Sequence, residues 1–511
     1  MTTPSEAPVD TQQLVLPLDD FASRDARGPG IPRQNRVFCN RNLKLSSISW
    51  VGFDMDYTLA IYDQPAMDDL SIRATIEKLI KRGYPDFIKT VPVSTQFPVR
   101  GLLIDKRFGH VLKMDRYKHV HKGYHGFREL TKEELRALYH SKKIRPATPR
   151  YHWIDTLYAL SEVATYAALV DAMEKKGYAV DYARLFTDIR EGIDEAHRDG
   201  TILDEVASNL PHYVHRDPNL APALHKLRSA GKKLFLLTNS RWAYTEKMMT
   251  YLLHGAMTEY PTWRNFFDVV IVAATKPIFF TEKRPLLERD GEMVRPAVAP
   301  LERGKIYEGG NLQELERALG VTGDEVLYVG DHIYGDILRS KKDSAWRTAM
   351  IMQELETEIA AYESCRDDLA TIEQLDDQRE QLEDDLRFYQ ARIKELTRLI
   401  EQRGKTEANG APVTIAALEA DRMRFKRAVE RIRGKLRQIE AEVTALERRS
   451  DLRFHPYWGS LLKEGAEQSS FGKQVDDYAC LYTSRVSNFL SYSPQQTFRS
   501  PRDVMSHEIG M

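Results

Sequence analysis

Two aspartates that follow an apolar stretch are the residues of this chain best suited to chemistry. Asp54 and Asp56 stand two positions apart, directly after the predicted strand Ile48–Phe53. Carboxylates at the end of a buried strand are costly unless a proton or a cation lies between them. The pair therefore suits a nucleophile and an acid/base group that share a Mg²⁺ ion, which would also screen a phosphate. The alternative is a solvated turn that ends a strand.

A second polar group follows the predicted strand Lys233–Leu237. Thr238, Asn239 and Ser240 present hydroxyls and backbone N–H groups at the point where a helix begins. Helix N-termini bind anions, so this is a candidate phosphate site. The same three residues also make an ordinary helix N-cap.

A lysine follows the next predicted strand, Phe267–Ala273. Lys276 stands where a cation would neutralise phosphate charge and keep a nucleophilic carboxylate ionised. Lys283 and Lys305 are the alternatives for this role.

A glycine and two further acids complete the set. Gly330, Asp331 and Asp336 follow the predicted strand Val326–Val329. Glycine allows a close backbone approach, and the two acids are spaced to supply a metal ligand and a group that holds this ligand. Each of the four clusters is weak evidence by itself, but the ordered set is specific.

The elements that carry these residues predict an α/β fold. Short β-branched runs, with Thr348–Met352 as a weaker fifth one, alternate with helical stretches and end in polar clusters instead of hairpin turns. This alternation predicts a doubly wound parallel sheet, whose active sites gather beyond the carboxyl ends of the strands.

A long segment separates the first two of these strands. Gly101–Ile104 and His110–Met114 are expected to form a β-hairpin, and Trp153–Glu174 and Tyr182–His197 to form helices. Because the segment is too long for a simple crossover connection, it predicts an inserted α+β cap domain over 61–204.

Beyond Met352 the pattern changes to apolar heptads on two segments around a Gly- and Pro-containing gap. This pattern predicts an antiparallel helical hairpin over 353–450. Arms of about 50 and about 35 residues, at about 1.5 Å per residue, would differ in length. Ile372 and Leu375 on the longer arm would then need the core, the C-terminal segment or another subunit as a partner, and we predict that the hairpin contributes to a homo-oligomer interface.

Composition excludes several other classes of protein. Among 511 residues, 74 lysines and arginines nearly balance 75 aspartates and glutamates, so charge gives no argument for a nucleic acid or membrane partner. The 3 cysteines cannot build a disulfide framework. No stretch approaches the ~18 apolar residues of a transmembrane helix, and the N-terminus lacks a signal-peptide pattern. We therefore expect a cytoplasmic protein.

The ordered clusters resemble those of the haloacid-dehalogenase superfamily. Longer stretches, FDMDYTLAIY, LLTNS, KPIFF, YEGGN and YVGDHIYGDILRSKK, are similar to the cytosolic purine 5'-nucleotidase family. The resemblance covers residues 36–352 and resumes faintly over 458–507. It implies Mg²⁺-dependent hydrolysis of nucleoside monophosphates such as IMP and GMP, with phosphotransfer to another nucleoside as a side activity.

The resemblance implies roles for the acids of the core. Asp54 would be the nucleophile and a metal ligand. Asp56 would be the general acid/base and would offer its carbonyl to the metal. Asp331 would be the third metal ligand, held from behind by Asp336.

It also implies roles for the residues that face the phosphate. Thr238 would bind the phosphate through its hydroxyl, with Asn239 and Ser240 beside it. Lys276 would be the lysine that faces the phosphate.

In the cap, the resemblance implies a site for the base. Arg190, Asp194 and His197 stand at i, i+4 and i+7, so they share one face of a helix. Arginine and acid could read the donor and acceptor edge of a 6-oxopurine, and Tyr158 would stack on the base. A solvated helix with an Arg–Asp pair is the alternative.

We therefore expect a Mg²⁺-dependent 5'-nucleotidase with a haloacid-dehalogenase-like core. A phosphatase of another phosphomonoester, or a scaffold that binds partners through the hairpin, are the alternatives. The expected parts are a poorly ordered leader (1–35), a catalytic core (36–60 and 205–352), the cap (61–204), the hairpin (353–450) and a C-terminal segment that packs back on the core (451–511).

Overall fold

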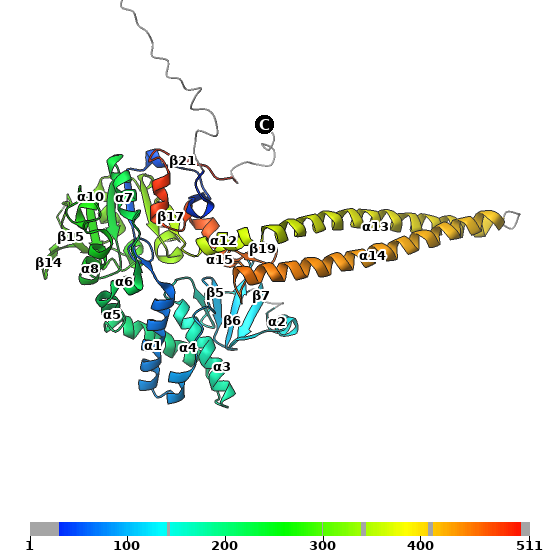
Figure 1. Ribbon diagram of the computed structural model, residues 1–511, viewed down its shortest axis with the longest axis horizontal. Helices are drawn as coiled ribbons and strands as arrows, with labels where there is room; N and C mark the ends of the chain where they lie inside the picture. The colour runs from blue at the N-terminus through cyan, green and yellow to red at the C-terminus, as the bar shows by residue number, and fades with distance from the viewer. Residues whose placement is uncertain (1–29, 140–143, 299, 339–343, 407–411, 502–511) are drawn as a thin grey trace, which may run out of the picture.

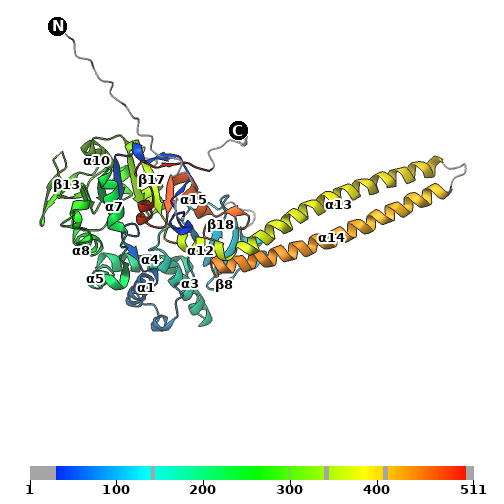
Figure 2. The ribbon, with the colours of Figure 1, turned by 45° about the horizontal axis from the view of Figure 1, so that its top comes forward.

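The computed structural model describes residues 30–139, 144–298, 300–338, 344–406 and 412–501. It shows two packed bodies and a long helical pair that projects away from them (Figures 1 and 2). Residues 1–29 of the predicted leader, 407–411 of the predicted turn and 502–511 of the predicted C-terminal segment lie outside the described residues. Among the described helices, none is both long and apolar enough to cross a membrane.

A 10-stranded sheet forms the first body. Its strands from β20 to β15 run parallel, and β1, β13 and β14 add antiparallel edges. The predicted parallel α/β sheet is thereby confirmed. In spatial order the strands are β1 (Phe38–Cys39), β20 (Leu481–Thr483), β17 (Arg347–Ile351), β16 (Val326–Gly330), β3 (Trp50–Phe53), β11 (Lys233–Leu237), β12 (Val269–Val272), β15 (Ile306–Gly309), β13 (Leu286–Asp290) and β14 (Met293–Pro296).

The central strands are buried on both faces, which explains their continuous apolar sequence. Along β11, Leu234 and Leu236 belong to one hydrophobic cluster, while Phe235 and Leu237 belong to the cluster on the opposite face. A Cβ atom added to Gly52 on β3 would lie 2.1 Å from the Phe235 ring. Glycine is therefore required where this ring crosses the neighbouring strand.

Helices cover both faces of this sheet and connect its strands. The connections between parallel strands require such crossovers. The helices are α7 (Leu220–Ser229), α8 (Trp242–Leu253), α9 (Ile278–Thr281) and α10 (Leu312–Leu319).

The second body contains its own 5-stranded antiparallel sheet, with α1, α3 and α4 below it in Figure 1. The predicted β-hairpin is confirmed, because β5 pairs antiparallel with β6. The sheet order is β8 (Arg128–Glu129), β7 (Val120–His125), β6 (His110–Met114), β5 (Leu102–Asp105) and β9 (Tyr151–Ile154). The helices are α1 (Gln64–Lys81), α2 (Lys132–Tyr139), α3 (Leu160–Lys175), α4 (Tyr182–Arg198), α5 (Leu203–Ser208) and α6 (Leu210–Tyr213).

One helix prediction in this body is wrong at its start. Trp153 was expected to begin a helix, but Tyr151–Ile154 form β9, which pairs antiparallel with β5, and α3 begins only at Leu160. A short strand has no periodicity of its own strong enough to reveal a partner far away in the chain. The prediction for α4 holds to within one residue.

The chain leaves the core and returns to it through a pair of short strands. β4 (Ile61–Tyr62) pairs antiparallel with β10 (Val214–His215). The two connections between the bodies are therefore joined side by side, which fixes the cap next to the carboxyl end of β3.

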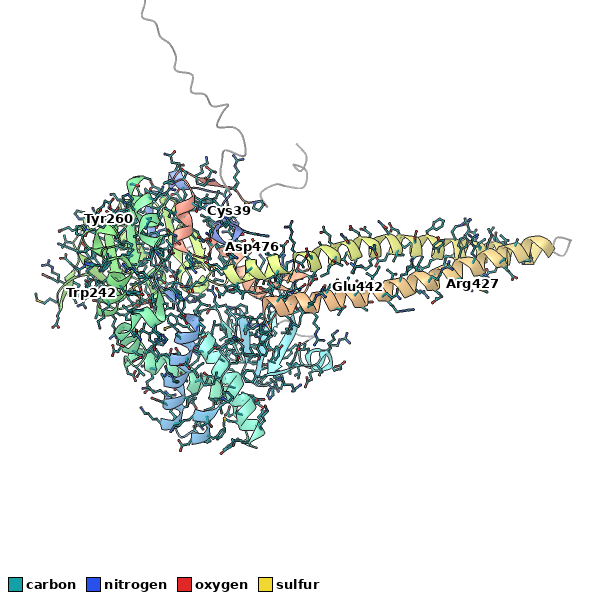
Figure 3. All side chains as sticks on the ribbon, in the orientation of Figure 1. Cys39, Trp242, Tyr260, Arg427, Glu442 and Asp476 are labelled. Atoms are coloured by element: carbon teal, nitrogen blue, oxygen red, sulfur yellow. The ribbon has the colours of Figure 1, made fainter. Side chains whose placement is uncertain are left out.

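The predicted helical hairpin is confirmed, but its predicted proportions are wrong. α13 (Arg366–Thr406) has 41 residues and α14 (Pro412–Phe454) has 43. The arms are equal because the first residues of the expected longer arm form a separate helix, α12 (Leu355–Ser364). Charged side chains such as Arg427 and Glu442 line the projecting pair (Figure 3).

The premise of the predicted oligomer is therefore corrected. Leu375 packs with Ile439, Val443 and Leu446 of the other arm, and Ile372 lies against the same cluster. Both side chains have partners within one chain, as matched heptads allow.

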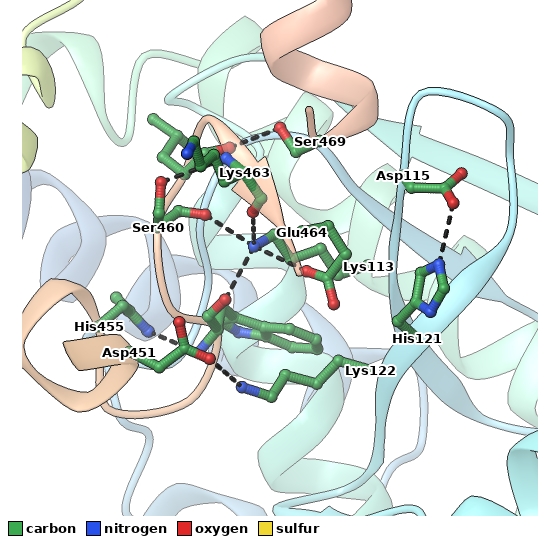
Figure 4. A network of polar contacts seen from close by, with 12 residues as sticks. Lys113, Asp115, His121, Lys122, Asp451, His455, Ser460, Lys463, Glu464 and Ser469 are labelled. Carbon is green, nitrogen blue, oxygen red and sulfur yellow. Dashed lines mark hydrogen bonds and ion pairs between the residues drawn. The ribbon is translucent and has the colours of Figure 1, made fainter. Parts of the chain in front are cut away.

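The C-terminal segment returns to both bodies. β20 joins the main sheet beside β17. Within the cap, the buried ammonium of Lys113 donates to the carbonyls of Trp458, Ser460 and Lys463 and pairs with Glu464 at 2.8 Å (Figure 4). A lysine with four oxygen partners can be buried without an unpaired charge, so this contact fastens the segment to β6.

Candidate active site

A buried lysine and two carboxylates meet at the carboxyl end of β3. Lys276 Nζ lies 2.9 Å from Asp54 Oδ1 and 2.7 Å from Asp336 Oδ1. Burial alone would lower the pKa of Lys276, but Asp336 and Asp54 outweigh this and raise it well above its usual value. Lys283 is exposed, and Lys305 pairs with surface glutamates. Of the three candidate lysines, Lys276 is thus the one beside Asp54.

Three carboxylates in the same place can hold a metal ion. Asp54, Asp331 and Asp336 each bring an oxygen within 4.8 Å of the others. Burial, assisted by Asp336, raises the pKa of Asp331 to about 7, and burial likewise raises the pKa of Asp54 although Lys276 opposes it. The three buried carboxylates carry more negative charge than one lysine offsets, and the atoms that they offer to a metal are all oxygen. Such a site fits a hard divalent cation such as Mg²⁺.

The position of Asp336 depends on Gly330. A Cβ atom added to Gly330 would lie 2.6 Å from the Cβ of Asp336, and the His332 N–H donates to Asp336 Oδ2 at 3.3 Å. The glycine at the end of β16 therefore admits this carboxylate. Sequence reasoning placed Asp336 behind the ligands, whereas here its oxygen belongs to the group of three.

The carboxylate of Asp56 lies outside this group. Tyr62 donates to its Oδ1 and Ser240 donates to its Oδ2, both at 2.6 Å. Tyr62 also forms a hydrogen bond of 2.9 Å with Tyr244. Burial raises the pKa of Asp56, while the two hydroxyl donors oppose the rise. A metal contact of Asp56 through its carbonyl stays a prediction.

The residues after β11 mostly position other groups. Thr238 accepts a hydrogen bond from the Ser240 N–H at 3.1 Å. The amide of Asn239 is engaged at both ends by the backbone of Lys276, donating at 3.0 Å and accepting at 2.5 Å. The side chain of Asn239 thus holds the lysine loop, and its predicted contact with substrate stays a prediction.

A hollow of about 520 Å³ lies in the cap next to these groups. The four cap residues predicted to bind the base all line it. Its lining is Thr156, Tyr158, Glu162, Arg190, Ile193, Asp194, His197 and Arg198.

Aromatic rings join this hollow to the acids. Tyr158 packs edge-on against Tyr57 at 4.7 Å and against His197 at 5.5 Å. Tyr57 in turn lies 4.8 Å from Tyr62, which donates to Asp56. Burial lowers the pKa of His197, so its ring is neutral at physiological pH.

Sequence reasoning missed Glu162 and Tyr62. Glu162 is buried, and this burial raises its pKa to about 7 although the charge of Arg190 opposes the rise. The distance from Arg190 Nε to Glu162 Oε2 is 3.8 Å. Its Oε2 has no hydrogen-bond partner among the described residues. Because Tyr158 precedes α3, helical spacing from Tyr158 gives no signal for Glu162, and the contact of Tyr62 depends on the turn after Asp56.

The sequence model of the 5' nucleotidase family matches residues 37–510. The chain belongs to the 5' nucleotidase family. The resemblance to the 5'-nucleotidase family is thus confirmed, and the enzyme is a 5'-nucleotidase with a largely parallel α/β core and a helical hairpin.

Curated relatives of this nucleotidase are similar over nearly its whole length. A 5'-nucleotidase domain-containing protein of Dictyostelium discoideum is 28% identical over 93% of the chain and 75% of its own length. 5'-Nucleotidase domain-containing protein 2 of Rattus norvegicus is 28% identical over 92% of the chain and 80% of its own length. The Homo sapiens protein of the same name is 27% identical over 92% and 85%.

Solved structures are similar only remotely. CbbY from Rhodobacter sphaeroides in complex with phosphate is 16% identical, with a TM-score of 0.23 over 60% of this chain and 86% of its own. L-2-haloacid dehalogenase from Xanthobacter autotrophicus is 15% identical, with a TM-score of 0.20 over 60% and 78%. At these TM-scores nothing further is inferred from them.

Proposed function

We propose that this nucleotidase hydrolyses purine nucleoside 5'-monophosphates of the IMP and GMP type through a phosphoryl group carried by Asp54. The observation that supports this most is the pairing of Asp54 and Lys276 beside a cap hollow lined by Arg190 and Asp194. A phosphate bound at Asp54 and a base bound in the hollow would belong to one nucleotide.

In the first proposed step, a carboxylate oxygen of Asp54 attacks phosphorus and the bond from phosphorus to the 5' oxygen breaks. Asp56 gives its proton to the departing oxygen. Burial, which raises the pKa of Asp56, favours the protonated form that this step needs. Lys276 and Thr238 hold the phosphoryl oxygens.

In the second step, Asp56 takes a proton from a water molecule. The water oxygen attacks phosphorus, the bond to Asp54 breaks, and inorganic phosphate leaves. A nucleoside hydroxyl in place of water would give phosphotransfer, which we propose as a side activity.

Asp54 and Asp331 would hold Mg²⁺, together with Asp336 or the carbonyl of Asp56. When bound, the ion would offset the charge of the phosphate and of the buried carboxylates. Because Lys276 already pairs with Asp54 and Asp336, it would remain as the fixed cation of the site.

In the cap, a purine would stack on Tyr158 and meet the polar side chains of α4. Arg190 can donate to the 6-oxo group and to N7, while Asp194 and Glu162 can accept from ring and amino N–H groups. The Oε2 of Glu162, which has no hydrogen-bond partner among the described residues, supports this assignment.

A phosphate-release assay over a panel of substrates tests the proposed function. We expect IMP and GMP to be hydrolysed faster than AMP, CMP, UMP and sugar phosphates, and we expect EDTA to stop release and Mg²⁺ to restore it. Preference for a sugar phosphate would identify a phosphatase of another phosphomonoester. Equal rates with and without Mg²⁺ would contradict the metal assignment.

We further propose that the hairpin joins two copies of this chain. Tyr389 and Phe425 pack together at 5.6 Å inside the pair, but their near neighbours Phe388 and Met423 are 58% and 51% exposed. Exposed apolar side chains on one stretch of a projecting hairpin suit a second copy of the same surface.

Replacing residues 370–448 by a short Gly/Ser linker is expected to lower the oligomeric state while most hydrolysis survives, because the hairpin projects away from the active site. Light scattering of the full chain and of the chain without the hairpin measures the mass. The double variant Phe388→Ser with Met423→Ser is a milder test that keeps the hairpin and changes only these two exposed apolar side chains. An excised chain that keeps the native mass would exclude the hairpin as the interface.

A further inference from the structure

Three acids at the start of α12 fasten this helix to three other segments. Glu356 pairs with Arg485 at 2.6 and 3.1 Å. Glu358 accepts from the Ser460 hydroxyl and from the Leu461 N–H. The third acid, Glu354, occupies the N-cap position of the helix and pairs with Arg100, which lies two positions before the first residue of β5 in the cap.

Arg100 differs from the other two partners because it reaches the active site. Its Nε and Nη2 donate to the two carboxylate oxygens of Glu354, each at 2.6 Å, and its Nη1 donates to the backbone carbonyl of Asp331 at 3.0 Å. The Arg100 side chain is 0% exposed. The planar fork of donors serves both carboxylate oxygens of Glu354 and the carbonyl of Asp331 at the same time, a geometry that lysine would reproduce only in part.

The surroundings of Arg100 leave the guanidinium little freedom to move. The ring of Phe471 on α15 (Ser470–Tyr478) lies 5.1 Å from it. A Cβ atom added to Gly101, which has a φ of +85°, would lie 2.4 Å from the Cβ of Phe471. The close approach of this backbone to α15 holds Arg100 between the cap, the C-terminal segment and the core.

The carbonyl that Arg100 holds belongs to a carboxylate of the candidate metal site. The Asp331 carbonyl starts the loop that continues through Ile333–Leu338, and within it the Asp336 N–H donates to the His332 carbonyl at 2.9 Å. The carbonyl and the carboxylate of Asp331 branch from the same Cα atom, so a hydrogen bond that holds this backbone limits how far the carboxylate can shift from Asp54 and Asp336. Groups that orient a metal ligand in this manner change metal affinity and activity without touching the metal.

We propose that Arg100 is a positioning residue of the metal site. By holding the Asp331 carbonyl, Arg100 orients the Asp331 carboxylate. Its pair with Glu354 makes this orientation depend on the base of the helical hairpin. The inference rests on the proposed function, because it concerns the proposed Mg²⁺ site. It goes beyond that function by assigning to a residue outside the strand-end clusters a part in forming the site.

Removal of Arg100 therefore has two separable effects. The tertiary link between the cap and α12 is lost, and the partly buried Glu354 carboxylate and the Asp331 carbonyl lose their donor, which destabilises the fold. In addition, the Asp331 loop is freed, which weakens the metal site. The Arg485–Glu356 pair fastens the same helix to the C-terminal segment, so its removal is expected to lower stability alone, since neither residue contacts the site.

Isothermal titration calorimetry with Mg²⁺ on the full chain separates these effects. Arg100→Leu is expected to raise the Kd for Mg²⁺ by about 10- to 100-fold, and Arg100→Lys to raise it less. Arg485→Leu, the matched control, is expected to lose stability in thermal melting but to keep the Mg²⁺ affinity of the unchanged protein. With GMP as substrate, the loss in Arg100→Leu should be reduced by high Mg²⁺.

A folded Arg100→Leu protein that binds Mg²⁺ as tightly as the Arg485→Leu protein overturns the inference while the proposed function stands. Where Arg100→Leu does not fold, Arg100→Lys decides, and wild-type affinity in that variant overturns it equally. If the unchanged protein binds no Mg²⁺ at all, both the proposed metal site and this inference fall.

Discussion

Asp54→Asn is expected to leave the fold intact and to reduce phosphate release from GMP by more than a thousandfold. The amide is no nucleophile, and it also removes a charge from the group that Asp331 and Asp336 complete. A thousandfold loss corresponds to about 4 kcal/mol in the activation barrier. Steady-state phosphate release measures the loss, and thermal melting verifies the fold.

Asp331→Ala is the matched comparison for this variant. It removes a carboxylate of the same group but no attacking atom, so we expect its lost activity to be partly restored by high Mg²⁺. An Asp54→Asn protein that retains more than a thousandth of the activity would show that no covalent intermediate forms on this residue.

Arg190→Ala and Asp194→Ala are expected to impair hydrolysis of 6-oxopurine monophosphates far more than hydrolysis of p-nitrophenyl phosphate. Both side chains line the cap hollow, and p-nitrophenyl phosphate has no purine edge to occupy it. A buried polar contact of this kind is worth about 1–3 kcal/mol, which is roughly a 10- to 100-fold change in kcat/KM. Kinetics on the two substrates side by side give the ratio.

Arg184→Ala is the control on the same helix. The Arg184 side chain is 73% exposed and pairs only along its own helix with Asp188, so both substrates should be hydrolysed as before. If Arg190→Ala and Asp194→Ala lowered the rates on both substrates equally, these residues would support the fold or the phosphate and not the base.

Local sequence patterns were sufficient to predict the core strands and the residues at their ends. The strand Lys233–Leu237 was predicted with its observed bounds, because alternate side chains enter the two apolar layers and a polar cluster follows directly. The four polar clusters (acids, hydroxyls, a lysine and further acids) could be predicted in their order along the chain because each directly follows an apolar strand. Carboxyl ends of parallel strands meet at one edge of a sheet, whatever the chain does between them.

Tertiary structure alone decided how these residues divide their tasks. Lys276 had two alternatives in the sequence, Lys283 and Lys305, and the loop after β12 decides between them by bringing Lys276 to Asp54. The fold likewise brings the short amide of Asn239 to the backbone of Lys276. Such contacts depend on loop conformation to within an ångström, and spacing along a chain does not specify it.

The same limit explains the errors in the hairpin and the cap. Heptads showed that two helices pair. The break at Cys365 between α12 and α13 gives the two arms nearly the same length, but the apolar pattern of the sequence does not reveal this break. The strand Tyr151–Ile154 exists because β5 lies beside it. Arg100 is joined to Glu354, 254 positions away in the chain. The periodicity of a segment shows which of its faces is apolar and will be buried. It does not show which distant segment packs on that face, because this is decided only when the chain folds.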